Sequence, residues 1–518
     1  MLWEPFPPGI WHDDGVYLLL GRALADGEGL RYAGVSGAPL APKFPPVYPL
    51  TLALVWRLFP NLPTDTGIFG LINVLFLVSG GAVFAAFLRR ALHFSVPAAV
   101  GVAGLVWLSV DLWRVAMVPL SESLFIVLLI AALWVGTELE QRPGPRRLAV
   151  FLGAFALLYH TRTIGVVVGA AMPLALVTRV HRRMAAGTAL GVAGVVLPWV
   201  VWSGAVAREI PESLRDILGS YGGWLVKQAV ESPLSFLAGL PSAAWGLLDR
   251  LLRVTVPLST TSVRMTGAVV LTAALAFGVY QLGHRSRTTA FSIVLFLGVL
   301  WVWPYQDRRL VTPLIPFIWA AGALSVVPGL VALRDLVVRG SESGTPPGGF
   351  RRLLPLAGAL AVVWFGWFAV GSTIELNRGT HVAPYQIRAR MLARSVEALR
   401  GIAPVGAVVG APELWPGIHL HTGLTVAPSA LFRPVASAGP SWGDPGQQFR
   451  LWQAAEIEYV VLELGGAVHG AALDELSRLC SDQAVQYVAI WSGASLVHLN
   501  WDEDCRRKAR DWKPPPKP

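Results

Sequence analysis

Long apolar runs separated by short basic clusters dominate this chain, and they constrain its fold more than any other feature. The runs follow one another from residue 68 to residue 371, and most approach the roughly 20 residues that a helix needs to cross a bilayer. Only 14% of the 518 residues are charged, whereas soluble domains carry about 25%. The sequence therefore predicts a polytopic α-helical membrane protein.

The basic clusters predict a topology, because Lys and Arg gather in cytoplasmic loops. If every cluster is cytoplasmic, five segments share the outer face. They are the loop with Asp13, the start of the run with Glu122, the turn before Arg162, the segment with Arg309 and the C-terminal region. We expect a transmembrane domain over residues 61–375 with about ten spans: Ile68–Leu88, Val96–Leu112, Leu120–Thr137, Leu148–Leu158, Ile164–Val177, Gly187–Val201, Gly267–Leu282, Phe291–Trp303, Leu310–Leu333 and Leu353–Gly371.

Residues 1–60 are predicted to form the first extracytoplasmic loop with its juxtamembrane helices. Asp13 and Asp14 open an amphipathic segment, and a glycine-broken loop leads to the lone Lys43 and to an interfacial or re-entrant helix at Val47–Phe59. An acidic pair and a cation beside a membrane indicate a site for a charged, lipid-borne group. No signal peptide is visible, so we expect either a further membrane helix before Met1 or insertion directed by a later helix.

The carboxylates of this face have a catalytic and a structural interpretation. Asp13 or Asp14 could act as a base that deprotonates an acceptor, or the pair could cap the following helix; one residue could cap while the other reacts. Glu122 opens an apolar helix, where a carboxylate is either functional or a partner of the helix dipole.

Four cations on the same face, Lys43, Arg162, Arg308 and Arg309, run against the positive-inside trend. Lys and Arg suit phosphate recognition, whereas single cations at an interface also snorkel to water. Candidate substrate contacts are the rings of Tyr17, Tyr48, His160 and Tyr305, although a lone histidine is more often structural.

Some partners are disfavoured by the sequence. No cluster of His, Cys or carboxylates has the spacing of a metal site, so no cofactor is implied, and a divalent metal stays open as an alternative. The net charge of +10 does not indicate nucleic-acid binding, because a basic stripe with interleaved aromatic residues is missing.

From about Thr380 the pattern changes to short strands alternating with helices, which predicts a small extracytoplasmic α/β domain over residues 380–510. Cys480 and Cys505 lie in this domain and would form a disulfide if it faces an oxidising compartment. Residues 511–518, rich in Lys and Pro, are expected to be disordered. The predicted elements are helices at Arg388–Leu399 and Ala471–Leu479 and strands at Ala407–Val409, Glu458–Leu464, Val485–Ile490 and Ser495–Leu499.

Several motifs resemble those of membrane glycosyltransferases of the GT-C fold, in particular the protein O-mannosyltransferase and aminoarabinose transferase group and bacterial dolichyl-phosphate-mannose-type mannosyltransferase-like proteins. They are the acidic pair before a tyrosine-bearing helix and a glycine-rich turn, the K-x-P-P-x-Y-P segment from Lys43 to Pro49, the S-E-x-L-F element at Ser121–Phe125, and Arg309 followed by Pro313 and Pro316. Leu310 departs from the pattern, because an aromatic residue is common there.

The resemblance implies an inverting glycosyltransferase in the cell inner or plasma membrane. A polyprenyl-phosphate-linked sugar would be the donor, and the acceptor would be a lipid, a protein or a glycan on the extracytoplasmic face. Asp13 would be the base, Glu122 would orient the acceptor or Asp13, and Lys43 with Arg162 and Arg309 would stabilise the departing phosphate. The alternatives are a transporter or lipid flippase, and a catalytically inactive GT-C-like scaffold.

Overall fold

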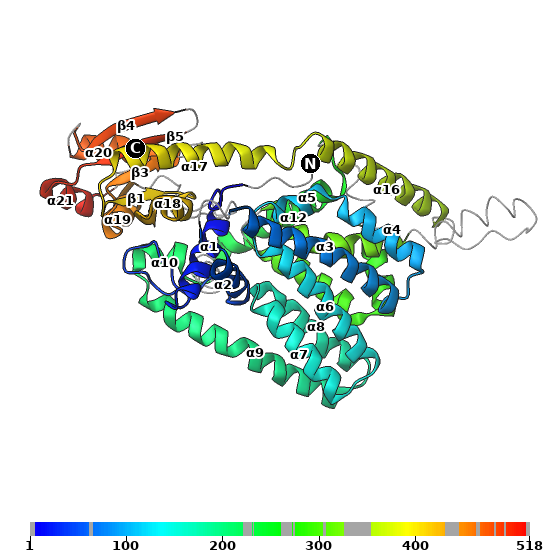
Figure 1. Ribbon diagram of the computed structural model, residues 1–518. Coiled ribbons are helices and arrows are strands. Elements are labelled where there is room, and N and C mark those ends of the chain that lie inside the picture. The colour runs from blue at the N-terminus through cyan, green and yellow to red at the C-terminus, as the bar shows by residue number, and fades with distance from the viewer. Residues whose placement is uncertain are drawn as a thin grey trace, which may run out of the picture.

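The computed structural model describes residues 6–61, 66–220, 230, 233–260, 272, 275–303, 307–325, 354–429, 445–462, 467–480, 483–491 and 494–513. Within these ranges a helical part and a smaller C-terminal α/β domain lie next to each other, with α1 (His12–Ala25) and α2 (Val47–Leu58) at the boundary between them (Figure 1).

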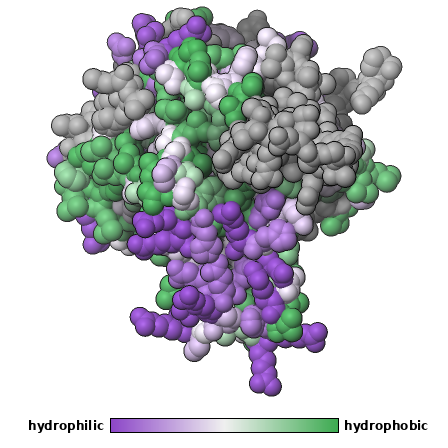
Figure 2. Space-filling view, turned by 90° about the vertical axis from the view of Figure 1, so that its right-hand side faces the viewer, coloured by the Kyte–Doolittle hydropathy of each residue, from purple (hydrophilic) through white to green (hydrophobic). Residues whose placement is uncertain are grey.

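Three of the described helices are long and apolar enough to cross a membrane: α3 (Thr66–Arg90), α6 (Glu122–Gln141) and α9 (Arg182–Glu209). A fourth is added if α4 (Val96–Trp107) and α5 (Val110–Ala116) are counted as a single span, bent by 63° at a short break. Figure 2 shows apolar side chains over the flank of the helical part and hydrophilic ones gathered at its lower end. The predicted polytopic helical membrane protein is confirmed, and the number of about ten spans stays a prediction.

Helix α6 is the centre of the helical part. It packs against α3, α7 (Pro145–Tyr159), α8 (Val166–Thr178) and α14 (Arg287–Val302), and it buries residues on all sides, as a helix surrounded by other helices must. Further helices of this part are α10 (Glu212–Leu218), α12 (Pro233–Thr255), α16 (Leu354–Asn377) and the 3-10 turns η1 (Thr163–Gly165) and η2 (Arg308–Leu314).

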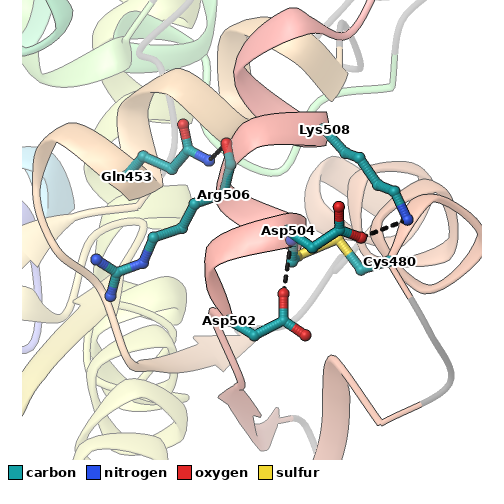
Figure 3. The surroundings of a disulfide bond; sticks show 7 residues. Gln453, Cys480, Asp502, Asp504, Arg506 and Lys508 are labelled. Carbon is teal, nitrogen blue, oxygen red and sulfur yellow. Dashed lines mark hydrogen bonds and ion pairs between the residues drawn. A yellow bond between two sulfur atoms is a disulfide. The ribbon is translucent and has the colours of Figure 1, made fainter.

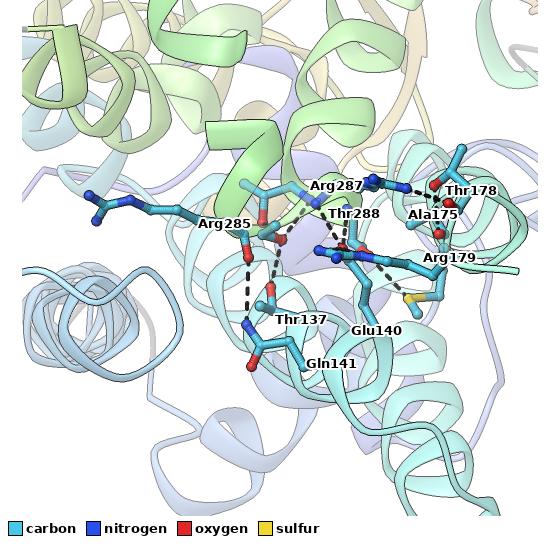
Figure 4. Close-up of polar contacts among 12 residues, drawn as sticks. Thr137, Glu140, Gln141, Ala175, Thr178, Arg179, Arg285, Arg287 and Thr288 are labelled. Carbon is cyan, nitrogen blue, oxygen red and sulfur yellow. Dashed lines mark hydrogen bonds and ion pairs between the residues drawn. The ribbon is translucent and has the colours of Figure 1, made fainter. Parts of the chain in front are cut away.

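Buried Glu140 fixes the end of α6 that lies far from Glu122 (Figure 4). Its carboxylate accepts hydrogen bonds from the backbone N–H groups of Arg287, at 3.2 Å, and Thr288, at 2.9 Å, which are the first residues of α14. It also accepts from the Thr288 hydroxyl at 2.9 Å and from the Arg179 guanidinium at 3.1 Å. A buried charge thus satisfies the N–H groups that the start of α14 leaves without intrahelical partners.

Two predicted spans differ from the observed helices. The run Val96–Leu112 breaks between α4 and α5, where Ser109 with extended backbone starts the second helix. The run Leu310–Leu333 starts as the 3-10 turn η2, because Pro313 removes a backbone donor, and an α-helix follows over 315–325.

The C-terminal domain contains a five-stranded mixed sheet in the order β2-β1-β3-β5-β4. β1 (Val408–Ala411) pairs in parallel with β2 (Thr425–Pro428) and β3 (Tyr459–Leu462), and β5 (Ala494–Leu499) pairs antiparallel with β3 and β4 (Val485–Trp491). The helices of the domain are α17 (Ala383–Ile402), α18 (Trp415–Thr422), α19 (Pro445–Ala454), α20 (Ala467–Leu479) and α21 (Glu503–Asp511). The predicted α/β domain is present; β2, α18, α19 and α21 are additional to the predicted elements.

A disulfide joins Cys480, at the end of α20, to Cys505 in the first turn of α21 (Figure 3). The Asp502 carboxylate caps α21 by accepting a hydrogen bond from the Cys505 backbone N–H at 2.6 Å. Beyond α21, the Trp512 indole N–H donates to the Glu475 carboxylate at 3.0 Å. Residues 511–513, at the start of the segment predicted to be disordered, belong to the described structure.

The C-terminal domain packs directly on the first loop. Gly9 and Gly417 bring two backbones together so closely that a Cβ on Gly417 would lie 2.3 Å from the Gly9 carbonyl oxygen. Val35 forms an isolated parallel bridge with Val426 of β2, which extends the contact between loop and sheet. The start of α1 and the C-terminal domain are thus held in one arrangement.

Candidate active site

The two adjacent aspartates at the start of α1 have different roles. The Asp14 carboxylate accepts hydrogen bonds from the backbone N–H groups of Gly9 and Trp11, both at 2.8 Å, so it caps the turn that leads into the helix. Burial raises the pKa of Asp14 to about 7 despite these two hydrogen bonds. Asp14 thus makes the capping contacts that the structural interpretation of the pair requires.

Asp13 instead points to the other charged residues of the outer face. Its carboxylate forms an ion pair with the guanidinium of Arg309 and a 3.1 Å contact with the imidazole of His12. Burial alone would raise the pKa of Asp13, but Arg309, with His12 and Lys43, outweighs it and holds the pKa well below its usual value. Asp13 is thus ionised at neutral pH.

Glu122 is fully buried at the start of α6 and lies between two arginines. Its carboxylate is 2.5 Å from the Arg162 guanidinium and 3.9 Å from that of Arg309. Arg309 therefore joins Glu122 to Asp13, and Asp307 fixes Arg309 through a 2.8 Å contact with its Nε. These residues come from α1, α6, the turn before η1 and the start of η2, so the structure brings four distant segments of the chain together.

Tyrosine and asparagine side chains hold the segment in front of Glu122. The Tyr17 hydroxyl is 2.8 Å from that of Ser121. The Asn73 amide donates to the carbonyls of Val118 and Leu120, at 2.7 and 2.8 Å, and the Tyr48 hydroxyl donates to the Asn73 amide oxygen at 3.0 Å. Tyr17 and Tyr48, predicted as substrate contacts, are buried supports of this segment in the structure.

A second ion cluster adjoins the first. Arg308 and Arg114 both pair with the Asp111 carboxylate, at 2.8 and 3.4 Å. The Tyr385 hydroxyl, at the start of α17, donates to the Arg114 carbonyl at 2.6 Å. Arg308 thus lies beside Asp111 of α5. Asp111 was not predicted as a site residue from the sequence, although a carboxylate inside a predicted membrane span indicates a functional site.

Lys43 is almost buried, and its ammonium group donates to the Ile217 carbonyl at the end of α10, at 3.1 Å. Burial lowers the pKa of Lys43 to about 8, although the nearby Asp13 carboxylate opposes that shift. Lys43 is therefore a cation at neutral pH that loses its charge in mildly alkaline solution.

A cavity of about 390 Å³ opens beside these clusters. Its wall includes Asp13 and Arg309 of the first cluster, Asp111, Arg114 and Arg308 of the second, and Tyr385 and Glu413 of the C-terminal domain. The Nε atoms of Arg114 and Arg308 and the indole Nε1 of Trp11 are buried there without a hydrogen-bond partner among the described residues. Buried donors of this kind suit a ligand rich in oxygen acceptors.

Among solved structures, the chain is similar to the crystal structure of ArnT from Cupriavidus metallidurans bound to undecaprenyl phosphate. The sequence identity is 13%, the TM-score is 0.51, and the match covers 94% of each chain. The chain has the GT-C fold. It is also similar to the archaeal oligosaccharyltransferase AglB from Archaeoglobus fulgidus, in complex with an inhibitory peptide and a dolichol-phosphate, with 12% identity, a TM-score of 0.48, and 88% of this chain and 65% of that chain covered. No family model and no curated protein matches the sequence.

The predicted GT-C fold class is thereby confirmed, whereas His160, a predicted contact residue, stays apart from the clusters. His160 ends α7, and its ring lies edge-on to the rings of Tyr159 and Trp199. Its carbonyl accepts a hydrogen bond from the Val47 backbone N–H at 2.9 Å, so it connects α7 to α2. Tyr305 lies outside the described residues.

The described part of this GT-C chain contains no group of three or more His, Cys, Asp or Glu side chains that could hold a metal ion. Asp13 and Glu122 are joined through Arg309, and each carboxylate is neutralised by arginine. A divalent metal therefore does not fit these two carboxylates in the observed arrangement.

Proposed function

We propose that the chain is a membrane glycosyltransferase that moves a sugar from a polyprenyl-phosphate donor to an acceptor on the extracytoplasmic face. The observation that carries this proposal is the meeting of Asp13, Glu122, Arg162 and Arg309 beside a cavity in a chain with the GT-C fold. The donor class is taken from the undecaprenyl phosphate bound to the similar ArnT structure.

In the proposed reaction, Asp13 acts as the general base. Its ionised carboxylate accepts the proton of an acceptor hydroxyl or amine while the oxygen or nitrogen attacks the anomeric carbon of the sugar. The bond from that carbon to the phosphate oxygen breaks, and the electron pair leaves with the lipid phosphate. Attack opposite to the leaving group inverts the anomeric configuration.

The departing phosphate gains negative charge, so cations around the cavity are the groups that would stabilise it. Arg309 lines the cavity, and Arg162 lies behind it against Glu122; both have guanidinium groups, whose planar fork suits phosphate oxygens. Lys43, outside the cavity wall but near Asp13, adds a point charge. The Nε of Arg308, which has no hydrogen-bond partner among the described residues, adds a further N–H donor in the cavity wall. Glu122 would keep Arg162 and Arg309 oriented toward Asp13.

The proposed sidedness rests on the disulfide and on the charge pattern. Disulfides persist in oxidising compartments, and the Cys480–Cys505 bond lies in the domain that packs on the Asp13 segment. The basic loops with Arg182 and Arg287 lie at the other end of the helical part, where the positive-inside trend predicts the cytoplasm. The cell inner or plasma membrane follows as the proposed location.

The test is sugar transfer from a panel of radiolabelled polyprenyl-phosphate sugars by inverted and right-side-out membrane vesicles that contain the protein. We expect transfer when the donor is on the extracytoplasmic face, and a product of inverted anomeric configuration. Labelled lipid that crosses the bilayer without losing its sugar would instead indicate a flippase. The absence of both transfer and transport over the whole panel would favour an inactive scaffold.

A further inference from the structure

We propose that the C-terminal domain completes the active site through two residues: Arg388 is a positioning residue for Asp13, and Glu413 contacts the acceptor. The inference rests on the proposed function and adds to it a role for the C-terminal domain and an acceptor class. Neither residue belongs to a motif in the sequence, and neither is one of the cations or carboxylates assigned to the transfer step.

Arg388 of α17 makes three contacts that converge on the start of α1. Its guanidinium lies over the Trp11 ring, 3.8 Å from the ring centre. It donates a hydrogen bond to the Ile10 carbonyl at 3.3 Å. It also forms a 2.5 Å ion pair with Glu413, which follows β1. One side chain thus ties the sheet domain to the two residues just before α1.

The contacts of Arg388 affect Asp13 because they hold the turn that leads into α1. Trp11 is the N-cap of α1, and its backbone N–H is held by Asp14 at 2.8 Å. Asp13 lies between these two capping residues in the chain, so the position of the turn sets where its carboxylate points. A displacement of about 1 Å at a reacting group can lower a rate by about 100-fold, and Arg388 restrains that displacement.

Glu413 belongs to the cavity wall, together with Tyr385 of the same domain and Asp13 on the first loop. It follows the carboxyl end of β1, and in sheets with parallel strands ligands gather at that edge. A carboxylate accepts hydrogen bonds only, whereas the Trp11 indole in the same wall donates one. A carboxylate acceptor and an indole donor in one cavity wall suit the hydroxyl groups of a glycan, each of which can donate and accept, so we infer a hydroxyl-rich acceptor.

The close contact between Gly9 and Gly417 makes this arrangement stiff. Gly417 lies in α18, directly after the Glu413 loop, and its backbone touches that of Gly9, just before Ile10 and Trp11. The ring of Trp415 also lies edge-on to that of His12, at 5.5 Å between ring centres. The C-terminal domain therefore meets the Asp13 segment through backbone and side chains together.

The first test compares Arg388→Met with Arg388→Lys and with the matched control Arg390→Met, an exposed arginine of the same helix. With a donor that the wild type uses, we expect kcat to fall about 10- to 100-fold in Arg388→Met, while the donor KM stays within about twofold. Arg388→Lys should lie between, because a lysine keeps the charge over Trp11 but lacks the fork. Arg390→Met should resemble the wild type.

The second test is Glu413→Gln, assayed against glycan acceptors of different size. We expect the acceptor KM to rise about tenfold, since hydrogen bonds to a charged group are weakened, whereas the donor KM changes little. Because Glu413 also pairs with Arg388, kcat should fall as well, but by less than in Arg388→Met. An unchanged acceptor KM would overturn the assignment of Glu413. The same KM increase with a hydroxyl-poor lipid acceptor would overturn the glycan as the acceptor class.

Hydrogen exchange of the backbone amides of residues 9–14 separates this inference from the proposed function, because it needs no substrate. We expect faster exchange in Arg388→Met than in Arg390→Met or the wild type. If the wild type transfers no sugar, the proposed function fails. Unchanged hydrogen exchange in Arg388→Met would overturn the role of Arg388, whether or not the wild type transfers sugar. Transfer by Arg388→Met at the wild-type rate would overturn that role while leaving the proposed function intact.

Discussion

Asp13 and Asp14 are neighbours in the chain with opposite electrostatic environments. Asp14 faces only backbone N–H groups in a buried turn, so desolvation dominates and its pKa rises to about 7. Asp13 is also buried, but Arg309 together with His12 and Lys43 outweighs the effect of burial there, so its pKa falls well below the usual value. Two carboxylates thus divide into a capping group and an ionised group that can accept a proton.

The capping role predicts how Asp14→Asn behaves with pH. The folded state binds the Asp14 proton more tightly than the unfolded state, so this residue's contribution to stability is fully present below about pH 4 and is lost as pH rises toward 7. We expect Asp14→Asn to lower the free energy of unfolding by about 1–2 kcal/mol at low pH, because asparagine has a single acceptor oxygen for the two backbone N–H groups that Asp14 holds, and by less at pH 8. Thermal unfolding in detergent at several pH values measures this; a loss that grows with pH would contradict the assignment.

Lys43 predicts a pH dependence of donor binding. Its pKa is lowered to about 8 by burial, so the ammonium form that would bind phosphate is present below pH 8 and is lost above it. We expect the donor KM to rise with pH above about 8 in the wild type. Lys43→Arg should remove this rise, because arginine stays protonated. A donor KM that rises equally in both proteins would show that another group is responsible.

At the scale of secondary-structure elements, the two ends of α6 serve different purposes. Glu122, at its start, belongs to the candidate site, whereas Glu140 caps α14 about 27 Å further along the helix. Both carboxylates are buried and paired with arginine. The two carboxylates thus differ in their position along the helix, one in the candidate site and one at the start of α14.

Glu140→Gln tests this distinction. A glutamine cannot neutralise Arg179 or accept all of the hydrogen bonds made by Glu140, so we expect a loss of about 3–5 kcal/mol in the free energy of unfolding. The kcat of the protein that remains folded should equal that of the wild type. Melting temperature and transfer rate, both normalised to folded protein, measure the two effects; a lower kcat without a change in stability would place Glu140 in the catalytic machinery.

The helical elements were predictable where apolar runs are long, as in α3 and α6, because burial and membrane contact both require such runs. The break between α4 and α5 was not predicted, since Ser109 and Asp111 lie inside an otherwise apolar run. The strands β1, β3, β4 and β5 carry β-branched residues in short runs and were predicted. β2 was missed, because its four residues end in a proline and give no alternating pattern.

At the scale of the whole molecule, the predicted topology places four charged residues on one face: Asp13, Glu122, Arg162 and Arg309. In the structure these residues are joined by ion pairs. The contributions of Arg388 and Glu413 could not be predicted, because they depend on how a separate domain packs on the first loop. The structural role of Asn73 was not predicted, although a polar side chain inside a predicted membrane span indicates a buried hydrogen bond. His160 shares the predicted face but lies at a helix junction outside the two ion clusters.

The most direct test of the central claim is the rate of sugar transfer by Asp13→Asn in membranes that lack other transferases for the same donor. Asparagine keeps the size of the side chain but cannot accept the acceptor's proton. We expect transfer to fall at least about 100-fold, in line with the loss of a general base, while membrane insertion stays close to that of wild type. The melting temperature should fall modestly, because the ion pair with Arg309 is lost although Asp307 still pairs with that arginine. Transfer at the wild-type rate by the folded variant would contradict the role of Asp13 and the mechanism built on it.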